Sequence, residues 1–362
     1  MTKQTYAQIQ QWYVAFEEML KENPQFEAVG RHFNSSVDDK ADISKLHAIH
    51  YNLRANQYLN PAFITNFTTC VDAFQRHVMG LPMVATSTAS FIAPVLAHLN
   101  DKGYARLPPL PAQIHKEMYD YLEGQPVRQA PNDRQSVEYV ERNEIREKEH
   151  VGKLSEHAVT NCPHFLEYIL SPEILQIVER RIGATPTLVS LDSWWSFADC
   201  QAPREAQNFH IDVDDYRFVK IFIYLTDVDK DAGPHTYIPG TQDRTFMTQL
   251  IERNQEKYPE MRNWYFAQLR KSDAEVAQYI GVEPDYLEGP AGSCMIVDTS
   301  GIHKGLLPNN KDRLLLQATF GCTPCKTTML DPLQMGSIST NNIKPDILTP
   351  PNDYIARLFV SN

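Results

Sequence analysis

The sequence predicts a mainly β core with helical additions, preceded by an extra helical region at the N-terminus. Two observations lead to this fold class. Segments rich in β-branched and aromatic residues, bounded by glycine and turn residues, recur through the second half of the chain. Apolar residues near the N-terminus instead recur at helical spacing. The expected strands are 187–191, 218–225, 292–298 and 313–320.

Residues 1–99 form the expected helical N-terminal region. Residues 5–23 are predicted to form an amphipathic helix that Pro24 ends. Residues 69–79 and 87–99 are further helix candidates because they are rich in apolar residues. Three alternatives stay open for this region, namely a helical layer against the β core, a surface for a homodimer, and a lid.

The expected core region, 100–325, opens with a strand at 103–108 and a helix at 111–122. Residues 125–156 are polar and charged, which favours a solvated helix or loop, with a mobile cover over a site as the alternative. Residues 171–183 predict a well-marked helix, because a serine, a proline and a glycine stand at its N-cap, first and closing positions.

Two segments lie outside this strand pattern. Residues 243–288 are expected to insert two helical pieces, the second opened by a capping box from Ser272 to Glu275 and closed by Gly281. The C-terminal tail, 326–362, is rich in proline, asparagine, serine and threonine, and is expected to pack on the surface of the core.

The overall charge excludes several classes of partner. The chain has 362 residues and a net charge of −11, which argues against binding to nucleic acid or to an anionic membrane. No run of about 18 apolar residues is present, and no apolar signal core follows Met1, so we expect a cytoplasmic protein. The six cysteines are then reduced thiols, and the lone pair Cys322 and Cys325 is weak evidence for zinc.

The candidate site begins with His210-Ile211-Asp212, answered later by His303. Residues two apart on a strand point to the same face, so His210 and Asp212 can both reach one ion. A lone His-x-Asp is more often a surface pair or a satisfied core histidine. The later His303, in a short loop between two expected strands, favours a mononuclear non-haem Fe(II) site with two imidazoles and one carboxylate.

Arg313 opens the strand that follows His303, ten positions after it. A lone arginine is more often a surface charge. At this register, however, its side chain can point into the same interior, and its planar guanidinium suits bidentate binding of a carboxylate. An iron site beside such an arginine predicts a dicarboxylate co-substrate, with 2-oxoglutarate as the obvious candidate.

The run from Gln207 to Gln242 resembles the core of the phytanoyl-CoA dioxygenase family. The matching pieces are the His-x-Asp pair, Leu225-x-Asp227, the Gly233-Pro234 to Gly240 loop and, downstream, the segment from Gly289 to Arg313. The resemblance covers roughly residues 100–325. Two positions depart from the family pattern. Gln242 stands where a histidine is common, and Gly305 stands where many members have a hydroxyl residue that helps bind the co-substrate.

This resemblance implies a double-stranded β-helix, a jelly-roll or cupin-like barrel flanked by helices. It implies Fe(II) held by His210, Asp212 and His303, with 2-oxoglutarate on Arg313 and O2 as the oxidant. The expected reaction hydroxylates, or otherwise oxidises, an unactivated C–H bond of a small metabolite, and releases succinate and CO2. Halogenating relatives lack the carboxylate ligand, so Asp212 argues for hydroxylation, desaturation or ring formation.

Further candidates line the expected cavity. Lys220 and Tyr224 are predicted to contact the co-substrate, and Trp195, Asn208 and His235 the substrate. Each has a plainer interpretation as a core or solvent-facing residue. Two rival functions stay open, namely a catalytically silent barrel used for binding or assembly, and a cupin-type metal enzyme that is not an oxygenase. The sequence does not identify the substrate.

Overall fold

The computed structural model describes residues 3–34, 60–129, 139–146, 149–198, 202–324, 338–339 and 346–361. Within these ranges, no helix combines the length and the apolar character that crossing a lipid bilayer requires.

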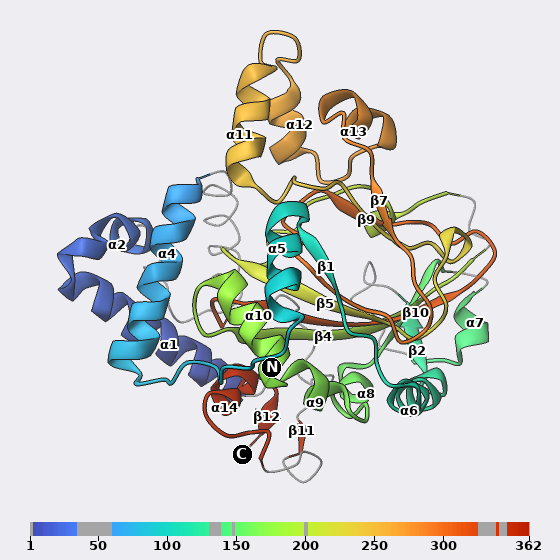
Figure 1. Ribbon diagram of the computed structural model, residues 1–362, viewed down its shortest axis with the longest axis horizontal. Helices are drawn as coiled ribbons and strands as arrows, with labels where there is room; N and C mark the ends of the chain where they lie inside the picture. The colour runs from blue at the N-terminus through green and yellow to red at the C-terminus, as the bar shows by residue number, and fades with distance from the viewer. Residues whose placement is uncertain are drawn as a thin grey trace.

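A seven-stranded antiparallel sheet forms the larger layer of the core, in the order β1-β8-β5-β10-β4-β3-β2 (Figure 1). Strand β10 lies at its centre and pairs with β5 on one side and β4 on the other, and all nine of its residues are buried. The strands are β1 (Tyr104–Leu107), β2 (Val127–Gln129), β3 (Val151–Leu154), β4 (Thr187–Ser196), β5 (Phe218–Tyr224), β8 (Cys294–Val297) and β10 (Arg313–Gly321).

A smaller sheet has the order β7-β6-β9, from β6 (His235–Tyr237), β7 (Asp285–Leu287) and β9 (His303–Gly305). An isolated bridge between His210 and His303 extends it by one more chain segment. From β4 to β10 the chain therefore passes back and forth between the two sheets. This path is that of a double-stranded β-helix. The expected fold class is therefore confirmed.

Three described helices of the N-terminal region lie together beside the barrel, α1 (Lys3–Glu22), α2 (Glu27–Asn34) and α4 (Pro61–Ala73) (Figure 1). Their apolar side chains join the same core as the larger sheet. Phe67 of α4 stacks on Tyr216, just before β5, with ring centroids 3.9 Å apart. The described part of this region therefore packs as a layer on the barrel. The homodimer stays a prediction.

Six described α-helices lie between this layer and β4 in the chain. They are α5 (Ile92–Lys102), α6 (Ala112–Glu123), α7 (Arg142–Arg146), α8 (Glu156–Thr160), α9 (Phe165–Ile169) and α10 (Pro172–Ile182). Helices α5, α6 and α10 overlap the expected helices 87–99, 111–122 and 171–183. Helix α10 starts after Ser171 and ends at Gly183, which has a φ of 84°. The expected polar segment 125–156 includes β2, α7 and β3 among its described residues, so part of it belongs to the large sheet.

The insertion contains three helices where two pieces were expected, α11 (Arg244–Arg253), α12 (Met261–Ala267) and α13 (Asp273–Tyr279). They lie together at one end of the barrel (Figure 1) and share a separate apolar cluster. Ser272 and Glu275 form the expected capping box at the start of α13. The extra helix arises because Met261, Trp264 and Tyr265 bury a short apolar face of their own.

The described part of the C-terminal tail returns to the first helix. Strands β11 (Ile338–Ser339) and β12 (Val360–Ser361) pair in parallel, and α14 (Asn352–Ala356) precedes β12. The indole nitrogen of Trp12 donates a hydrogen bond to the hydroxyl oxygen of Tyr354 at 3.0 Å. Cys322 is a buried free thiol. Its expected partner in the lone cysteine pair, Cys325, lies outside the described residues.

Candidate metal centre

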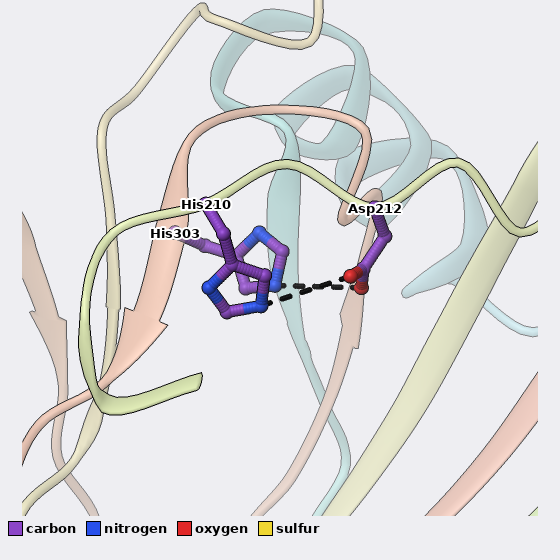
Figure 2. Close-up of side chains that lie close together, drawn as sticks. All are labelled: His210, Asp212 and His303. Carbon is purple, nitrogen blue, oxygen red and sulfur yellow. Dashed lines mark ion pairs between the residues drawn. The ribbon is translucent and has the colours of Figure 1, made fainter. Parts of the chain in front are cut away.

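Three side chains from two distant segments of the sequence converge inside the barrel (Figure 2). His210, Asp212 and His303 each offer one donor atom, and these atoms all lie within 4.8 Å of one another. The two carboxylate oxygens of Asp212 lie 3.7 Å from Nε2 of His210 and 3.5 Å from Nε2 of His303. Both imidazoles are buried. The arrangement is that of a compact two-histidine, one-carboxylate ligand set.

The hydrogen bonds on the far side of each imidazole fix its tautomer. Nδ1 of His210 lies 2.9 Å from the carbonyl oxygen of Asn208, and Nδ1 of His303 lies 2.9 Å from that of Gly301. A carbonyl oxygen only accepts, so Nδ1 carries the proton in both rings. The lone pair is then on Nε2, the atom that faces Asp212 and that a metal ion needs.

The backbone joins two of these residues directly. The main-chain N–H of His210 donates to the carbonyl oxygen of His303 at 2.9 Å, and the N–H of His303 donates back at 3.0 Å. The chain then leaves the sheet, and Asp212 is held by a bond from its N–H to the carbonyl of Thr299 at 2.9 Å. His210 and Asp212 therefore share one face without a regular strand, and His303 begins β9 where a loop was expected.

Lys220 is the cationic partner of two carboxylates at the metal centre, those of Asp212 and Asp214. Its ammonium group donates to Asp212 Oδ2 at 2.6 Å and pairs with Asp214 at 2.8 Å. Burial acts to raise the pKa of the Asp212 carboxyl, but Lys220 and the two imidazoles outweigh it and hold that pKa well below its usual range. Burial, with the neighbouring His303, lowers the pKa of His210 to about 3. The site therefore presents neutral imidazole and ionised carboxylate at neutral pH.

A cavity of about 400 Å³ opens beside these ligands, and Arg313 lines it. Arg313 is buried, and its guanidinium lies 3.1 Å from the hydroxyl oxygen of Ser196. Its buried Nε has no hydrogen-bond partner among the described residues. Gly305 lets the guanidinium approach the backbone closely, since a Cβ at that position would lie only 3.3 Å from it. The unpartnered donor beside the cavity fits an anionic group that approaches Arg313.

Two further predicted residues line the same cavity, Tyr224 and His235. The Tyr224 hydroxyl donates to the carbonyl of Leu287 at 2.9 Å and accepts from the main-chain N–H of His235 at 3.0 Å. Nε2 of His235 is buried without a partner in the described part of the chain. Burial, with His303 and Arg313, lowers the pKa of His235 well below its usual range, so the ring is neutral.

The other two substrate candidates do not line the cavity. Trp195 points into the apolar core, where Arg142 lies 4.3 Å from its ring centroid, and its neighbour Trp194 lines the cavity instead. The structure therefore places Trp194 and not the predicted Trp195 on the cavity side, because adjacent strand residues point to opposite faces. Asn208 also lies outside the lining, and its contribution is the carbonyl that orients His210.

Several polar residues that were not predicted from the sequence also line the cavity. Ser196 faces Arg313 across the paired strands β4 and β10. Four more polar side chains lie on the same two strands and another on β3, namely Ser190, Asp192, Gln317, Thr319 and Lys153. Polar residues at alternate positions of an otherwise apolar strand were the available signal, since such residues share one face.

Two comparisons with known proteins bear on this site. The family model described as phytanoyl-CoA dioxygenase matches residues 99–309, more than half of the chain and all three converging ligands. Among proteins of curated function, none matches the sequence.

Several solved structures resemble the fold. The non-heme alpha-ketoglutarate-dependent epimerase SnoN from nogalamycin biosynthesis is 14% identical, with a TM-score of 0.41 over 64% of this chain and 82% of its own. The carbocyclase SnoK of the same biosynthesis is 16% identical, with a TM-score of 0.42 over 66% and 86%. HygX from Streptomyces hygroscopicus, solved with nickel, 2-oxoglutarate and hygromycin B bound, is 13% identical, with a TM-score of 0.40 over 71% and 94%.

Proposed function

Because this chain belongs to the phytanoyl-CoA dioxygenase family, it is a 2-oxoglutarate-dependent non-haem iron enzyme, and we propose that it hydroxylates an unactivated C–H bond of a small metabolite. In this proposal His210, Asp212 and His303 hold the iron and Arg313 holds the co-substrate. The observation that carries it is the convergence of the three donor atoms, with both Nε2 lone pairs turned toward Asp212.

The donor set fits Fe(II) in number and in kind. Two neutral imidazoles and one carboxylate occupy one face of such an ion and leave the other face for co-substrate and oxygen. When bound, iron with 2-oxoglutarate and O2 supplies the oxidising power, and the products are succinate, CO2 and the hydroxylated substrate. An intact Asp212 keeps the third protein ligand in place, which supports hydroxylation over reactions that need an extra anion on the metal.

The remaining residues bind and orient. Arg313 is the anchor for the distal carboxylate of 2-oxoglutarate, because its guanidinium is buried and cationic, lines the cavity and keeps one donor without a partner among the described residues. Many family members have a hydroxyl residue at the position of Gly305, and in this chain Ser196 supplies that hydroxyl group. Its oxygen lies 3.1 Å from Arg313. Lys220 orients Asp212 and is a weaker candidate for direct co-substrate contact, because Asp212 and Asp214 both engage its ammonium group.

An anaerobic titration tests this function without any substrate. Metal-free protein receives Fe(II) and then 2-oxoglutarate, and the weak visible charge-transfer band of the chelated complex is recorded. The band should appear with both components, and should be absent when succinate replaces 2-oxoglutarate. A protein that binds iron but never develops the band would be a cupin-type metal enzyme of another kind. A protein that binds neither component would be a silent barrel.

A further inference from the structure

One wall of the cavity is polar, in a barrel of a size whose interior is either filled by side chains or holds one small ligand. Ser190 and Asp192 lie on β4, and Gln317 and Thr319 lie on β10. Asp192 is opposite Gln317 and Ser190 is opposite Thr319 in the register, so all four point to one face. Lys153 joins them from β3. We call these five residues the polar wall.

Within the polar wall the hydroxyl of Ser190 donates to that of Thr319 at 2.9 Å, whereas the contacts of Asp192 with Lys153 and Gln317 are long. Nζ of Lys153 lies 3.3 Å from Asp192 Oδ1, and Nε2 of Gln317 donates to Asp192 Oδ2 at 3.4 Å. Charge-assisted hydrogen bonds are normally about 2.7–2.9 Å long. The side chains of Lys153 and Asp192 keep 24% and 17% of their surface exposed. These groups are charged, reachable from the cavity and weakly committed to one another, so a ligand can replace their present contacts.

The polar wall lies beside the metal centre and apart from the co-substrate anchor. Lys220, which contacts Asp212, is opposite Thr319, and Thr319 is opposite Ser190. Neighbouring strands are about 4.8 Å apart, so the wall extends roughly 10 Å sideways from Lys220 to β4 and about 14 Å to Lys153 on β3. Arg313 is four residues before Gln317, about 13 Å along the strand. A molecule on the wall can therefore coexist with 2-oxoglutarate on Arg313.

An aromatic ring borders the polar wall. Trp194 lies two residues after Asp192 on the same face of β4, and it lines the cavity. Nζ of Lys153 lies 5.9 Å from its ring centroid. A flat apolar surface next to a carboxylate and an ammonium group suits a compact polar molecule, which can stack on the ring and place its charges on the wall.

We propose that the polar wall is the substrate-recognition surface, and that it selects a small metabolite with an ammonium group beside hydroxyl or carboxylate oxygens. Asp192 Oδ2 receives the ammonium group, while Lys153 and Gln317 donate to the oxygens. A long acyl chain would remove water from Asp192 and Lys153 without replacing its hydrogen bonds, which is costly for buried charges. This inference rests on the proposed function, because the wall is placed relative to the iron and to Arg313.

The test compares ligand classes on the anaerobic complex with Fe(II) and 2-oxoglutarate. The probes are L-amino acids, amino sugars, the matching neutral sugars, and dodecanoic acid with its coenzyme A ester. A substrate perturbs the charge-transfer band when it binds, and it stimulates succinate release when oxygen is admitted. L-Amino acids carry their ammonium group beside a carboxylate and amino sugars carry theirs beside hydroxyl groups, so the two arms identify the source of the ammonium group.

Asp192→Asn is the central variant, because it removes the charge and keeps the shape. It should weaken the response to the ammonium-bearing probe about 10- to 150-fold, the range for loss of one charge-assisted hydrogen bond. It should leave the 2-oxoglutarate titration unchanged. Lys153→Met is the second variant and should weaken the same response. The matched control is Asp101→Asn, the same chemical change at a carboxylate whose side chain is 71% exposed.

The possible outcomes distinguish a failure of this inference from a failure of the proposed function. If the band never forms in the wild type, the proposed function fails. If it forms but no ammonium-bearing probe perturbs it, or if dodecanoic acid or its ester does so instead, the polar wall is not the recognition surface. An equal response of Asp192→Asn and the wild type has the same meaning. A far-ultraviolet circular dichroism spectrum of each variant confirms that it is folded.

Discussion

The metal centre and the polar wall use similar residue types in opposite ways. At the metal centre each histidine is held by a main-chain carbonyl at 2.9 Å, and Asp212 is held by Lys220 at 2.6 Å. On the wall the corresponding contacts of Asp192 are 3.3 and 3.4 Å. Short bonds fix a geometry in advance, whereas long bonds can be exchanged. The metal centre is therefore suited to an ion that stays bound, and the polar wall is suited to a molecule that binds and leaves.

The largest expected effect comes from removing one ligand of the metal centre. His303→Ala should weaken Fe(II) binding by more than about 100-fold and abolish succinate formation, because loss of a ligand exceeds the 10- to 100-fold typical of losing an outer partner. Equilibrium dialysis against Fe(II) under nitrogen measures the affinity. Asp192→Asn is the contrasting variant and should bind iron normally. Full iron affinity in His303→Ala would remove this residue from the ligand set.

The next effect concerns the co-substrate. Arg313→Ala should raise the concentration of 2-oxoglutarate needed for half-saturation about 10- to 150-fold at fixed iron, through loss of a charge-assisted contact. Arg313→Lys should recover only part, because an ammonium group cannot reproduce the planar fork. The three curves are recorded by the visible band at saturating Fe(II). Coinciding curves would mean that the anchor lies elsewhere, with Lys220 the first alternative.

A smaller effect tests how Asp212 is held. Lys220→Met keeps the aliphatic stem and removes the ammonium group, so Asp212 loses its orienting partner and its pKa should rise. Iron affinity should fall about 10-fold at neutral pH, the lower end for an outer partner, and fall further as the pH is lowered. Metal binding measured across a pH series checks this. Lys116→Met, at a side chain that is 65% exposed, is the control and should match the wild type. An affinity unchanged by Lys220→Met would show that Asp212 needs no such support.

The last effect is on stability rather than on ligand affinity, and it is a pH dependence in the metal-free protein. Burial holds the pKa of His210 at about 3, whereas an unfolded histidine titrates near 6.5. Between these values the unfolded chain binds more protons, so the free energy of unfolding should decrease as pH falls from about 6.5 toward 3. Each such histidine contributes at most about 1.4 kcal/mol per pH unit. Urea midpoints measured against pH should show a shallower slope in His210→Gln than in the control His77→Gln, and equal slopes would contradict the assignment.

Much of the fold was predictable because its cues are local. Helix α10 carries its own cap and stop, and β5 and β10 are largely apolar runs bounded by turns. The metal ligands were predictable because His210 and Asp212 are close in sequence and His303 sits between two recognisable strands. The third helix of the insertion was missed because α12 depends on a small apolar cluster formed only after folding.

The rest of the site depended on strand register, which the sequence does not specify. Choosing between Trp194 and Trp195 requires knowing that Arg313 is opposite Ser196, which puts Trp194 on the cavity side. The polar wall likewise draws on three strands that are distant in the sequence. Lys220 was identified, but its contact with Asp214 needed the loop after Asp212 to fold back.

The reciprocal main-chain hydrogen bonds between His210 and His303 affect whether the site survives loss of its metal. Two ligands that the backbone ties together keep their spacing whether or not an ion is present, so removal of the metal does not have to unfold the site. An enzyme of this kind meets oxygen at every turnover and can lose its iron to oxidation. Because the ligands keep their spacing, oxidised iron can be removed by a chelator and Fe(II) can be supplied again to the same molecule. One protein molecule can therefore use several iron ions in succession.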